Sequence, residues 1–305
     1  MATTEARWNL REREIASRYF GQCERRQMGN EAIGREIGCS SPLVSQLRAQ
    51  TYTGRVGLYI AAMVRAMERS EARDRYRTTE IKFTRTSVAE RVIGALRLVH
   101  VRGDVGVIIG PTGVGKTCAA REYASEQPDT IYLIGGPNAS PKSVLNLIAT
   151  EVGLSWCGPQ FDLRNALCRR LSGTGRLLIL DEADFVSETT VQHLRIIQDE
   201  SRIGLAILGT EAYLGRLRGR RSPTLNQFLG RVGLEVHVGE CSDADLGMIA
   251  DGYNLDGAAL AVLFKGAQGQ ARRAVKALAN ARAMSNNGMS AAVLVEAFEQ
   301  LPKLL

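Results

Sequence analysis

Residues Gly110–Thr117 read GPTGVGKT, and this stretch decides the expected fold. It matches the pattern G-x-x-x-x-G-K-[ST], in which a glycine-rich loop lets backbone N–H groups surround phosphates. The β-like run Val105–Ile109 precedes it and the helical pattern CAAREYASE follows it, which is the order of strand, loop and helix that the pattern requires. The N-terminus of that helix adds partial positive charge, so the stretch predicts a nucleotide triphosphate site.

The residues of this loop have distinct expected roles. Lys116 is expected to reach the β- and γ-phosphates, and the Thr117 hydroxyl to ligate Mg²⁺. ATP and Mg²⁺ are therefore the expected cofactors. The expected nucleotide-binding residues run from the first glycine of the loop to the residue after Thr117: Gly110, Pro111, Thr112, Gly113, Val114, Gly115, Lys116, Thr117 and Cys118.

The segment Arg176–Asp184, RLLILDEAD, carries a second signal. Its continuous apolar run predicts a central parallel strand, because such a strand is covered on both faces. The carboxyl ends of parallel strands share one edge of a sheet, so Asp181 is expected beside the loop, where it supports the metal. Glu182 follows it and is expected to orient and polarise the attacking water.

Two further strands are expected at Ile203–Thr210 and Gly233–Val238. Thr210 ends the first of them, and its hydroxyl either contacts the γ-phosphate or the attacking water, or only caps a helix or turn. Strands alternate with helical patterns from Thr86 to about Gly239, and short amphipathic helices follow. This order predicts an α/β fold with a parallel sheet of five strands.

Composition excludes several classes of protein. The 305 residues suffice for two or three domains, and 45% hydrophobic with 23% charged residues is typical of a globular chain, not of a disordered or collagen-like one. The apolar runs are far shorter than the roughly 20 residues of a membrane helix, and the charged N-terminus lacks the apolar core of a secretory signal. A soluble cytoplasmic protein without a membrane partner is expected.

The six cysteines are scattered, without a C-x-x-C pair, and the chain has three histidines. Such spacing predicts neither a disulfide framework nor a zinc site. The cysteines are expected to be small buried apolar residues in a reducing compartment: Cys23, Cys39, Cys118, Cys157, Cys168 and Cys241.

Positive charge is concentrated in the N-terminal part of the chain. Residues 1–86 hold fifteen Arg and one Lys against ten Asp and Glu, which accounts for +6 of the net charge of +7. Such an excess suits a polyanion such as double-stranded DNA, because neutralised phosphates release counterions. A solvated helical face has the same composition, so charge alone leaves both interpretations open.

The segment Gly34–Leu47, GREIGCSSPLVSQL, has the spacing of a helix-turn-helix. Gly34 suits a close contact between two helices, and Ser41 with Pro42 predicts an N-cap and a first helical residue. The second helix, expected over Leu43–Gln50, turns polar side chains toward a DNA groove or phosphates, although a helical hairpin that binds nothing is the alternative. The expected DNA-binding residues of this segment are Arg35, Ser45, Gln46 and Arg48.

Together the quoted residues resemble AAA+ ATPases and, more narrowly, the AAA+ target-DNA activators of transposing phages, from about Glu31 to Leu301. The loop identifies only P-loop proteins in general, whereas the block from DEAD to ILG and the domain order are more specific. The resemblance implies an AAA+ core at 86–239 and a helical lid at 240–305. A small all-α helix-turn-helix domain at 1–55 and a basic linker helix or arm at 56–85 are expected before them.

The resemblance also implies roles for residues outside the loop. Thr210 stands at the first sensor position, where this family often has Asn, and Arg272 matches the second sensor and contacts nucleotide. Arg231 stands where these proteins carry an arginine finger aimed at the nucleotide of the neighbouring subunit. Lys116, Glu182, Thr210 and Arg231 are thus the expected catalytic residues. Four arginines are rivals for the finger or face DNA: Arg216, Arg218, Arg220 and Arg221.

The expected function is that of a Mg²⁺-dependent ATPase that binds duplex DNA largely without sequence preference. The resemblance implies an ATP-dependent helical oligomer on DNA that delivers target DNA to a DDE-type transposase, in a bacterium or a phage-infected cell. Two alternatives share the same motifs. One is a nucleotide-gated helix-turn-helix transcription regulator, and the other is an AAA+ helicase loader.

Overall fold

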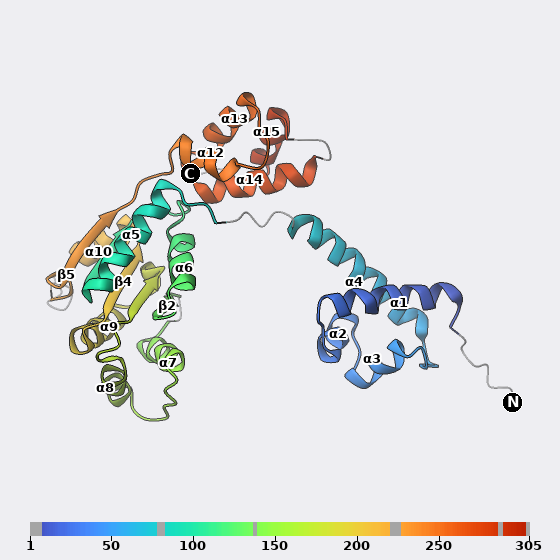
Figure 1. Cartoon of the computed structure of the whole chain (residues 1–305), viewed down its shortest axis with the longest axis horizontal. Helices are drawn as coiled ribbons and strands as arrows, with labels where there is room; N and C mark the ends of the chain where they lie inside the picture. The colour runs from blue at the N-terminus through green and yellow to red at the C-terminus, as the bar shows by residue number, and fades with distance from the viewer. Residues whose placement is uncertain (1–7, 78–82, 137–138, 220–226, 286–288, 303–305) are drawn as a thin grey trace. The chain divides into compact units, whose positions relative to one another are not determined.

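An all-α unit, residues 1–80, and an α/β unit, residues 81–305, make up the chain (Figure 1). The computed structural model describes residues 8–77, 83–136, 139–219, 227–285 and 289–302, and the side chains of these ranges except those of 72–77. No helix within these ranges is long and apolar enough to cross a bilayer. The described residues also contain no group of three or more His, Cys, Asp or Glu arranged to hold a metal.

Within residues 8–77, four helices form the N-terminal unit. They are α1 (Leu10–Arg25), α2 (Asn30–Ile37), α3 (Ser41–Arg48) and α4 (Val56–Arg77). A capping box starts α1, because the Asn9 side chain accepts from the Glu12 N–H while the Glu12 carboxylate accepts from the Asn9 N–H. Apolar side chains from all four helices make one core, so the helix-turn-helix segment is held by its neighbours on both sides.

The turn between α2 and α3 differs by one residue from the expected one. Gly38 has φ +74° and ends α2, as a turn residue should. Ser40, not Ser41, occupies the N-cap position, without a side-chain capping bond, and α3 begins at Ser41. The predicted N-cap and the predicted span Leu43–Gln50 were therefore wrong. Pro42 is tolerated one residue further in, because the first-turn N–H groups need no helical partner.

The start of α4 belongs to the core of the N-terminal unit. Val56, Ile60, Met63 and Met67 are buried at helical spacing, and α4 packs against α1. The expected boundary between a domain ending at residue 55 and a separate linker helix thus cuts through this packed core.

The α/β unit contains a fully parallel sheet of five strands in the order β2-β3-β4-β1-β5. The expected fold class is confirmed. β1, β3 and β4 are completely buried, which explains their continuous apolar sequences. The strands are β1 (Val105–Ile109), β2 (Thr130–Ile134), β3 (Leu177–Asp181), β4 (Gly204–Gly209) and β5 (Val232–His237).

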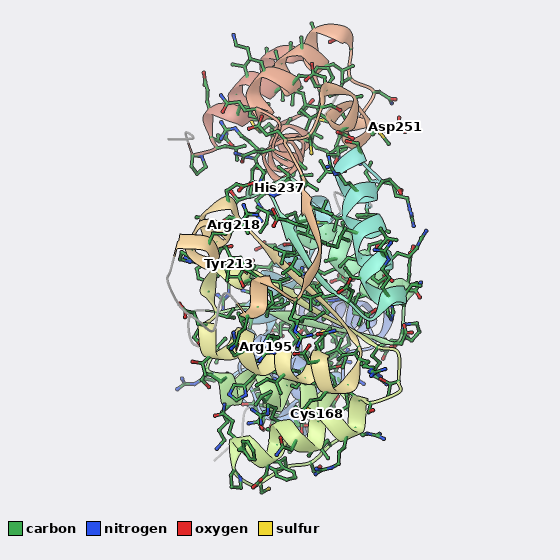
Figure 2. The ribbon with its side chains drawn as sticks, turned by 90° about the vertical axis from the view of Figure 1, so that its left-hand side faces the viewer. Cys168, Arg195, Tyr213, Arg218, His237 and Asp251 are labelled. Carbon is green, nitrogen blue, oxygen red and sulfur yellow. The ribbon has the colours of Figure 1, made fainter. Side chains whose placement is uncertain are left out.

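Helices cover both faces of this sheet. α5 and α6 pack on one face, and α7 to α10 pack on the other, where Cys168 and Arg195 mark the neighbouring helices α8 and α9 (Figure 2). The sequence alternates its strand side chains between these two cores. The helical elements are α5 (Ser87–Arg102), α6 (Lys116–Glu126), α7 (Pro141–Glu151), α8 (Gln160–Leu171), the 3₁₀ turn η1 (Ala183–Phe185), α9 (Glu188–Ser201) and α10 (Glu211–Gly219).

Within the described residues, four helices follow the sheet in the region where a helical lid is expected: α12 (Asp243–Ala250), α13 (Gly257–Ala267), α14 (Ala271–Met284) and α15 (Ala291–Glu299). The buried Asp245 of α12 joins this lid to α5. Its carboxylate accepts from the Ser87 N–H and hydroxyl over 2.6 and 2.8 Å, and from the Ser242 N–H and hydroxyl over 3.0 and 2.8 Å. No strand follows His237 in the described part of the chain.

The expectation that every cysteine is buried was wrong. Cys23, Cys168 and Cys241 are buried, whereas Cys118 and Cys157 are exposed. The exposed Cys118 lies in the first turn of α6, beside the glycine-rich loop.

Candidate nucleotide site

The glycine-rich loop joins β1 to α6 at the carboxyl edge of the sheet. Gly113 and Gly115 have φ +82° and +109°, conformations that side chains other than glycine's rarely adopt. A Cβ atom on Gly110 would lie 2.5 Å from Val238 Cγ2 and from the Val238 carbonyl oxygen. The loop therefore requires glycine for conformation at two positions and for space at a third.

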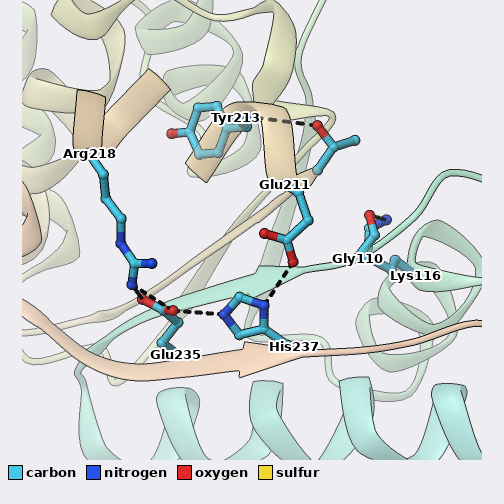
Figure 3. A network of polar contacts seen from close by, with 8 residues as sticks. Gly110, Lys116, Glu211, Tyr213, Arg218, Glu235 and His237 are labelled. Atoms are coloured by element: carbon cyan, nitrogen blue, oxygen red, sulfur yellow. Dashed lines mark hydrogen bonds and ion pairs between the residues drawn. The ribbon is translucent and has the colours of Figure 1, made fainter. Parts of the chain in front are cut away.

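Lys116, the first residue of α6, points back into the loop (Figure 3). Its Nζ donates to the carbonyl oxygens of Gly110 and Pro111 over 2.7 and 2.8 Å. Burial lowers the pKa of this ammonium group, whereas the carboxylates of Asp181 and Asp184 act in the opposite direction. The ammonium group is thus held at the glycine-rich loop, and its contact with the phosphates stays a prediction.

A cavity of about 720 Å³ opens in front of this loop. The residues that line it include the glycine-rich loop, two cations, threonines and three acids. Hard oxygen ligands of this kind suit Mg²⁺, and the N–H groups with Lys and Arg suit a triphosphate, so the donor set fits Mg·ATP. The polar and loop residues that line it are Thr112, Gly113, Gly115, Lys116, Thr117, Cys118, Asp181, Glu182, Asp184, Thr210 and Arg272.

Two acids at the end of β3 differ in their surroundings. Asp181 is only 2% exposed. Its carboxylate oxygens accept hydrogen bonds from the Glu182 N–H over 2.8 Å and from the Tyr132 hydroxyl over 2.7 Å. Glu182 is exposed to the cavity and has φ +53°, a strained conformation for a side chain of this kind. The buried acid is fixed, and the exposed one is free to meet a water molecule.

Thr210 follows β4 and lies next to Asp184 rather than being a simple cap. Its hydroxyl donates to Asp184 Oδ1 over 2.6 Å and its N–H donates to Asp184 Oδ2 over 3.1 Å. The hydroxyl also accepts from the Tyr213 N–H over 3.3 Å, so it caps α10 as well. Sequence reasoning missed Asp184 and Tyr132. The second acid of DEAD was a usable signal for Asp184, whereas nothing local marked Tyr132.

Arg272 is brought to the site by the lid. It stands in the first turn of α14, and its N–H donates to the Gly113 carbonyl over 2.9 Å. Its charge adds to the effects that lower the pKa of Lys116. The structure therefore brings Arg272 to residues of the glycine-rich loop more than 150 positions earlier, and its role as a second sensor stays a prediction.

Arg231 is not brought to this cavity. It directly precedes β5, which runs parallel to β1, so it lies at the amino edge of the sheet while the loop lies at the carboxyl edge. Its Nη1 is 3.6 Å from Asp199 Oδ1, and its side chain is 60% exposed.

The other arginines around α10 have partners within the unit. Arg216 donates to the Asp184 carbonyl over 2.7 Å. Arg218 makes two hydrogen bonds to Glu235, whose carboxylate also contacts His237 (Figure 3). Hydrogen bonds to Glu235 and Glu211 raise the pKa of the His237 imidazole. Arg220 and Arg221 lie outside the described residues.

The expected DNA-binding residues of the N-terminal unit are exposed. Ser45, Gln46 and Arg48 share the outer side of α3, while Val44 and Leu47 face the core. The Arg48 guanidinium lies 5.2 Å from the ring centre of Phe20, and the Arg35 Nε donates to the Glu31 carbonyl within its own helix. The amphipathic pattern of α3 therefore has the expected orientation.

The fold and this site are similar to those of P-loop domains of the AAA+ type. Residues 100–217 match the family model described as AAA domain. The fold is similar to that of the ORC2 protein of Aeropyrum pernix, solved in ADPNP–ADP complexes, with a TM-score of 0.57 and 19% identity over 75% of this chain and 72% of that chain.

Sequence comparison confirms the narrower resemblance, which is to the transposition proteins B of Mu-like phages. The chain is 27% identical over 234 residues to the Mu-like prophage FluMu DNA transposition protein B of Haemophilus influenzae, which covers 75% of this chain and 82% of that protein. It is 31% and 30% identical over 182 residues to the ATP-dependent target DNA activators B of Escherichia phages Mu and D108. Those two alignments cover 58% of this chain but only 57% of each phage protein.

Proposed function

We propose that this chain is an ATP-dependent DNA-binding ATPase that assembles on duplex DNA and delivers that DNA to a DDE-type transposase. The proposal is supported by relatives named as DNA transposition protein B and ATP-dependent target DNA activator B. The observation that carries it is the meeting of Lys116, Asp181, Glu182 and Arg272 at one cavity.

The chemistry follows from the residues of that cavity. Lys116 and the N–H groups of the loop bind the β- and γ-phosphates, and Arg272 adds positive charge from the lid. Thr117 and Asp181 hold Mg²⁺, which when bound offsets phosphate charge. Glu182 accepts a proton from the attacking water, and Thr210 with Asp184 fixes the turn beside it.

Self-association completes the site from outside. Arg231 is exposed at the amino edge of the sheet, away from the cavity of its own chain. A guanidinium in that place serves the nucleotide of a neighbouring copy, where it stabilises charge on the transferred phosphoryl group. ATP then bridges subunits of a helical oligomer around DNA, and hydrolysis weakens the contact. The assembly works in the cytoplasm of a bacterium or of a phage-infected host.

DNA binding is largely independent of sequence. The exposed Ser45, Gln46 and Arg48 of α3 can donate hydrogen bonds to phosphates, and such backbone contacts carry no sequence information. Because phosphate neutralisation releases counterions, affinity falls steeply as the salt concentration rises.

The test measures assembly on random-sequence duplex DNA by light scattering, in the presence of ATP, in the presence of ADP and without nucleotide. The unaltered protein forms large assemblies only with ATP. Lys116→Ala abolishes both nucleotide binding and assembly, whereas Lys142→Ala, an exposed lysine on α7, leaves both intact. Equal assembly in nucleotide-free buffer overturns the proposal. Adding the transposase and measuring strand transfer into the bound duplex tests delivery.

A further inference from the structure

Tyr132 reaches the nucleotide site without lining its cavity. It lies on β2, the edge strand beside β3, and pairs in register with Ile179, two residues before Asp181. Its hydroxyl donates to Asp181 Oδ2 over 2.7 Å. A tyrosine hydroxyl keeps its proton at neutral pH, so it is a permanent donor to this carboxylate.

A second contact ties Tyr132 to the helix that follows the glycine-rich loop. Arg121 of α6 donates from Nε to the Tyr132 hydroxyl over 3.4 Å, and its guanidinium lies 5.8 Å from the centre of the tyrosine ring. The same helix begins with Lys116 and Thr117. Tyr132 therefore connects the helix that carries Lys116 and Thr117 with the strand that carries Asp181.

The two donors to Asp181 act on different oxygens. The Glu182 N–H bonds Oδ1 over 2.8 Å and the Tyr132 hydroxyl bonds Oδ2, and the residue is 2% exposed. A carboxylate oxygen has more than one lone-pair direction, so each oxygen keeps capacity for a further partner. With both oxygens bonded from fixed elements, rotation of the carboxylate plane is opposed.

We propose that Tyr132 is a positioning residue that holds Asp181 in the orientation that receives the Mg²⁺ of Mg·ATP. The inference rests on the proposed function, because it takes Asp181 to support the metal. Hydrogen bonds to a ligating carboxylate set its direction, and their loss commonly weakens metal binding by about 10- to 100-fold.

The test compares nucleotide affinity with and without the metal. A non-hydrolysable fluorescent ATP analogue is titrated in Mg²⁺ and in EDTA, and the ratio of the two Kd values is the Mg²⁺ increment. Tyr132→Phe keeps the ring and removes the donor. This substitution is expected to lower the Mg²⁺ increment by about tenfold, close to the increment of Asp181→Asn, and to leave the Kd in EDTA unchanged. In a protein that already carries Asp181→Asn, Tyr132→Phe is expected to cause no further fall in the Mg²⁺ increment.

Tyr123→Phe is the matched control. Tyr123 lies on α6 and is buried, and its hydroxyl contacts His100 Nδ1 over 2.9 Å, away from the acids of the site. An unchanged increment in Tyr132→Phe, or an equal fall in Tyr123→Phe, overturns the positioning role while the proposed function stands. An unaltered protein whose ATP affinity ignores Mg²⁺ overturns both.

Discussion

Thr210 holds Asp184 with two hydrogen bonds, 2.6 Å from its hydroxyl and 3.1 Å from its N–H. The end of β4 is thereby fixed to the turn that follows β3, although 26 residues separate the two in the chain. The turn also carries Glu182, so the position of the exposed acid depends on this pair.

Removing that hydroxyl is expected to slow hydrolysis more than binding. Thr210→Val keeps the volume of the side chain but loses a hydrogen bond to a charged acceptor, a loss of about 1.5 to 3 kcal/mol. If about half of that loss falls on the transition state, the hydrolysis rate drops by about 4- to 13-fold. Phosphate release gives the rate and fluorescent nucleotide the Kd. Thr150→Val, on the exposed side of α7, serves as the control and leaves the rate unchanged.

Glu182→Gln is expected to separate binding from hydrolysis. Glutamine retains the shape but cannot accept the proton of the attacking water, and a general base contributes about 10²- to 10⁴-fold. ATP binding persists, and assemblies on DNA live longer. Single-turnover hydrolysis and the decay of light scattering after dilution measure the two effects. Turnover at the original rate contradicts the role of Glu182, whereas Glu151→Gln on α7 is expected to behave as the unaltered protein.

The sheet was largely predictable from sequence, and the reason is burial. β1, β3 and β4 are covered on both faces, so their sequences are continuously apolar and their carboxyl ends could be located. The loop, the acidic pair and Arg272 then follow from the position of those ends and from the family resemblance. Edge strands lack this signal, and β2, with an alternating pattern, gave no warning that Tyr132 points at Asp181.

The contacts that sequence could not reveal are those between distant segments. Asp245 and Ser87 are 158 residues apart, and neither stands in a pattern that suggests the other. Likewise the first turns of α4 pack into the N-terminal core because one face is apolar, while the charged run after them suggested a linker. The local sequence pattern indicates which side chains are buried, whereas tertiary packing determines which distant residues contact one another.

Gly34 provides a test of close packing in the N-terminal unit. A Cβ at this position would lie 2.4 Å from the Cys39 carbonyl oxygen, which is backbone and cannot swing away. Gly34→Ala is expected to destabilise the unit by about 2 kcal/mol, as measured by urea denaturation. Gly21→Ala, in α1 with nothing within 4 Å, is the control and is expected to be neutral or stabilising by about 0.5 to 1 kcal/mol. Equal effects contradict the packing explanation.

Asp245 is expected to make the link between lid and α5 sensitive to acid. Burial alone raises the pKa of this carboxyl, but hydrogen bonds from Ser87 and Ser242 outweigh it, so the net direction is downward. A carboxyl whose pKa is lower in the folded state stabilises the protein above the unfolded value, about 3.9, and loses that contribution as pH falls through the folded value.

Asp245→Asn is therefore expected to lower the free energy of unfolding by an amount that depends on pH. At pH 7 the variant is expected to be less stable by about 2 kcal/mol, because hydrogen bonds to a charged acceptor are lost. The difference in unfolding free energy from the unaltered protein should narrow below about pH 4. Urea titrations at several pH values measure it, with Asp251→Asn on the lid surface as the control. A difference independent of pH contradicts the charged role of Asp245.

At Glu182, the left-handed backbone conformation favours a different residue for folding stability than the proposed ATP hydrolysis does. Glycine or asparagine tolerates φ near +53° at lower cost than glutamate does, so either replacement relieves strain of order 1 kcal/mol. A laboratory selection for thermal stability alone should therefore accumulate such replacements at this position. The selected variants should have a higher melting temperature and should no longer hydrolyse ATP. Under the proposed role of Glu182 as the general base, a selection that also rewards ATP hydrolysis should retain the carboxylate.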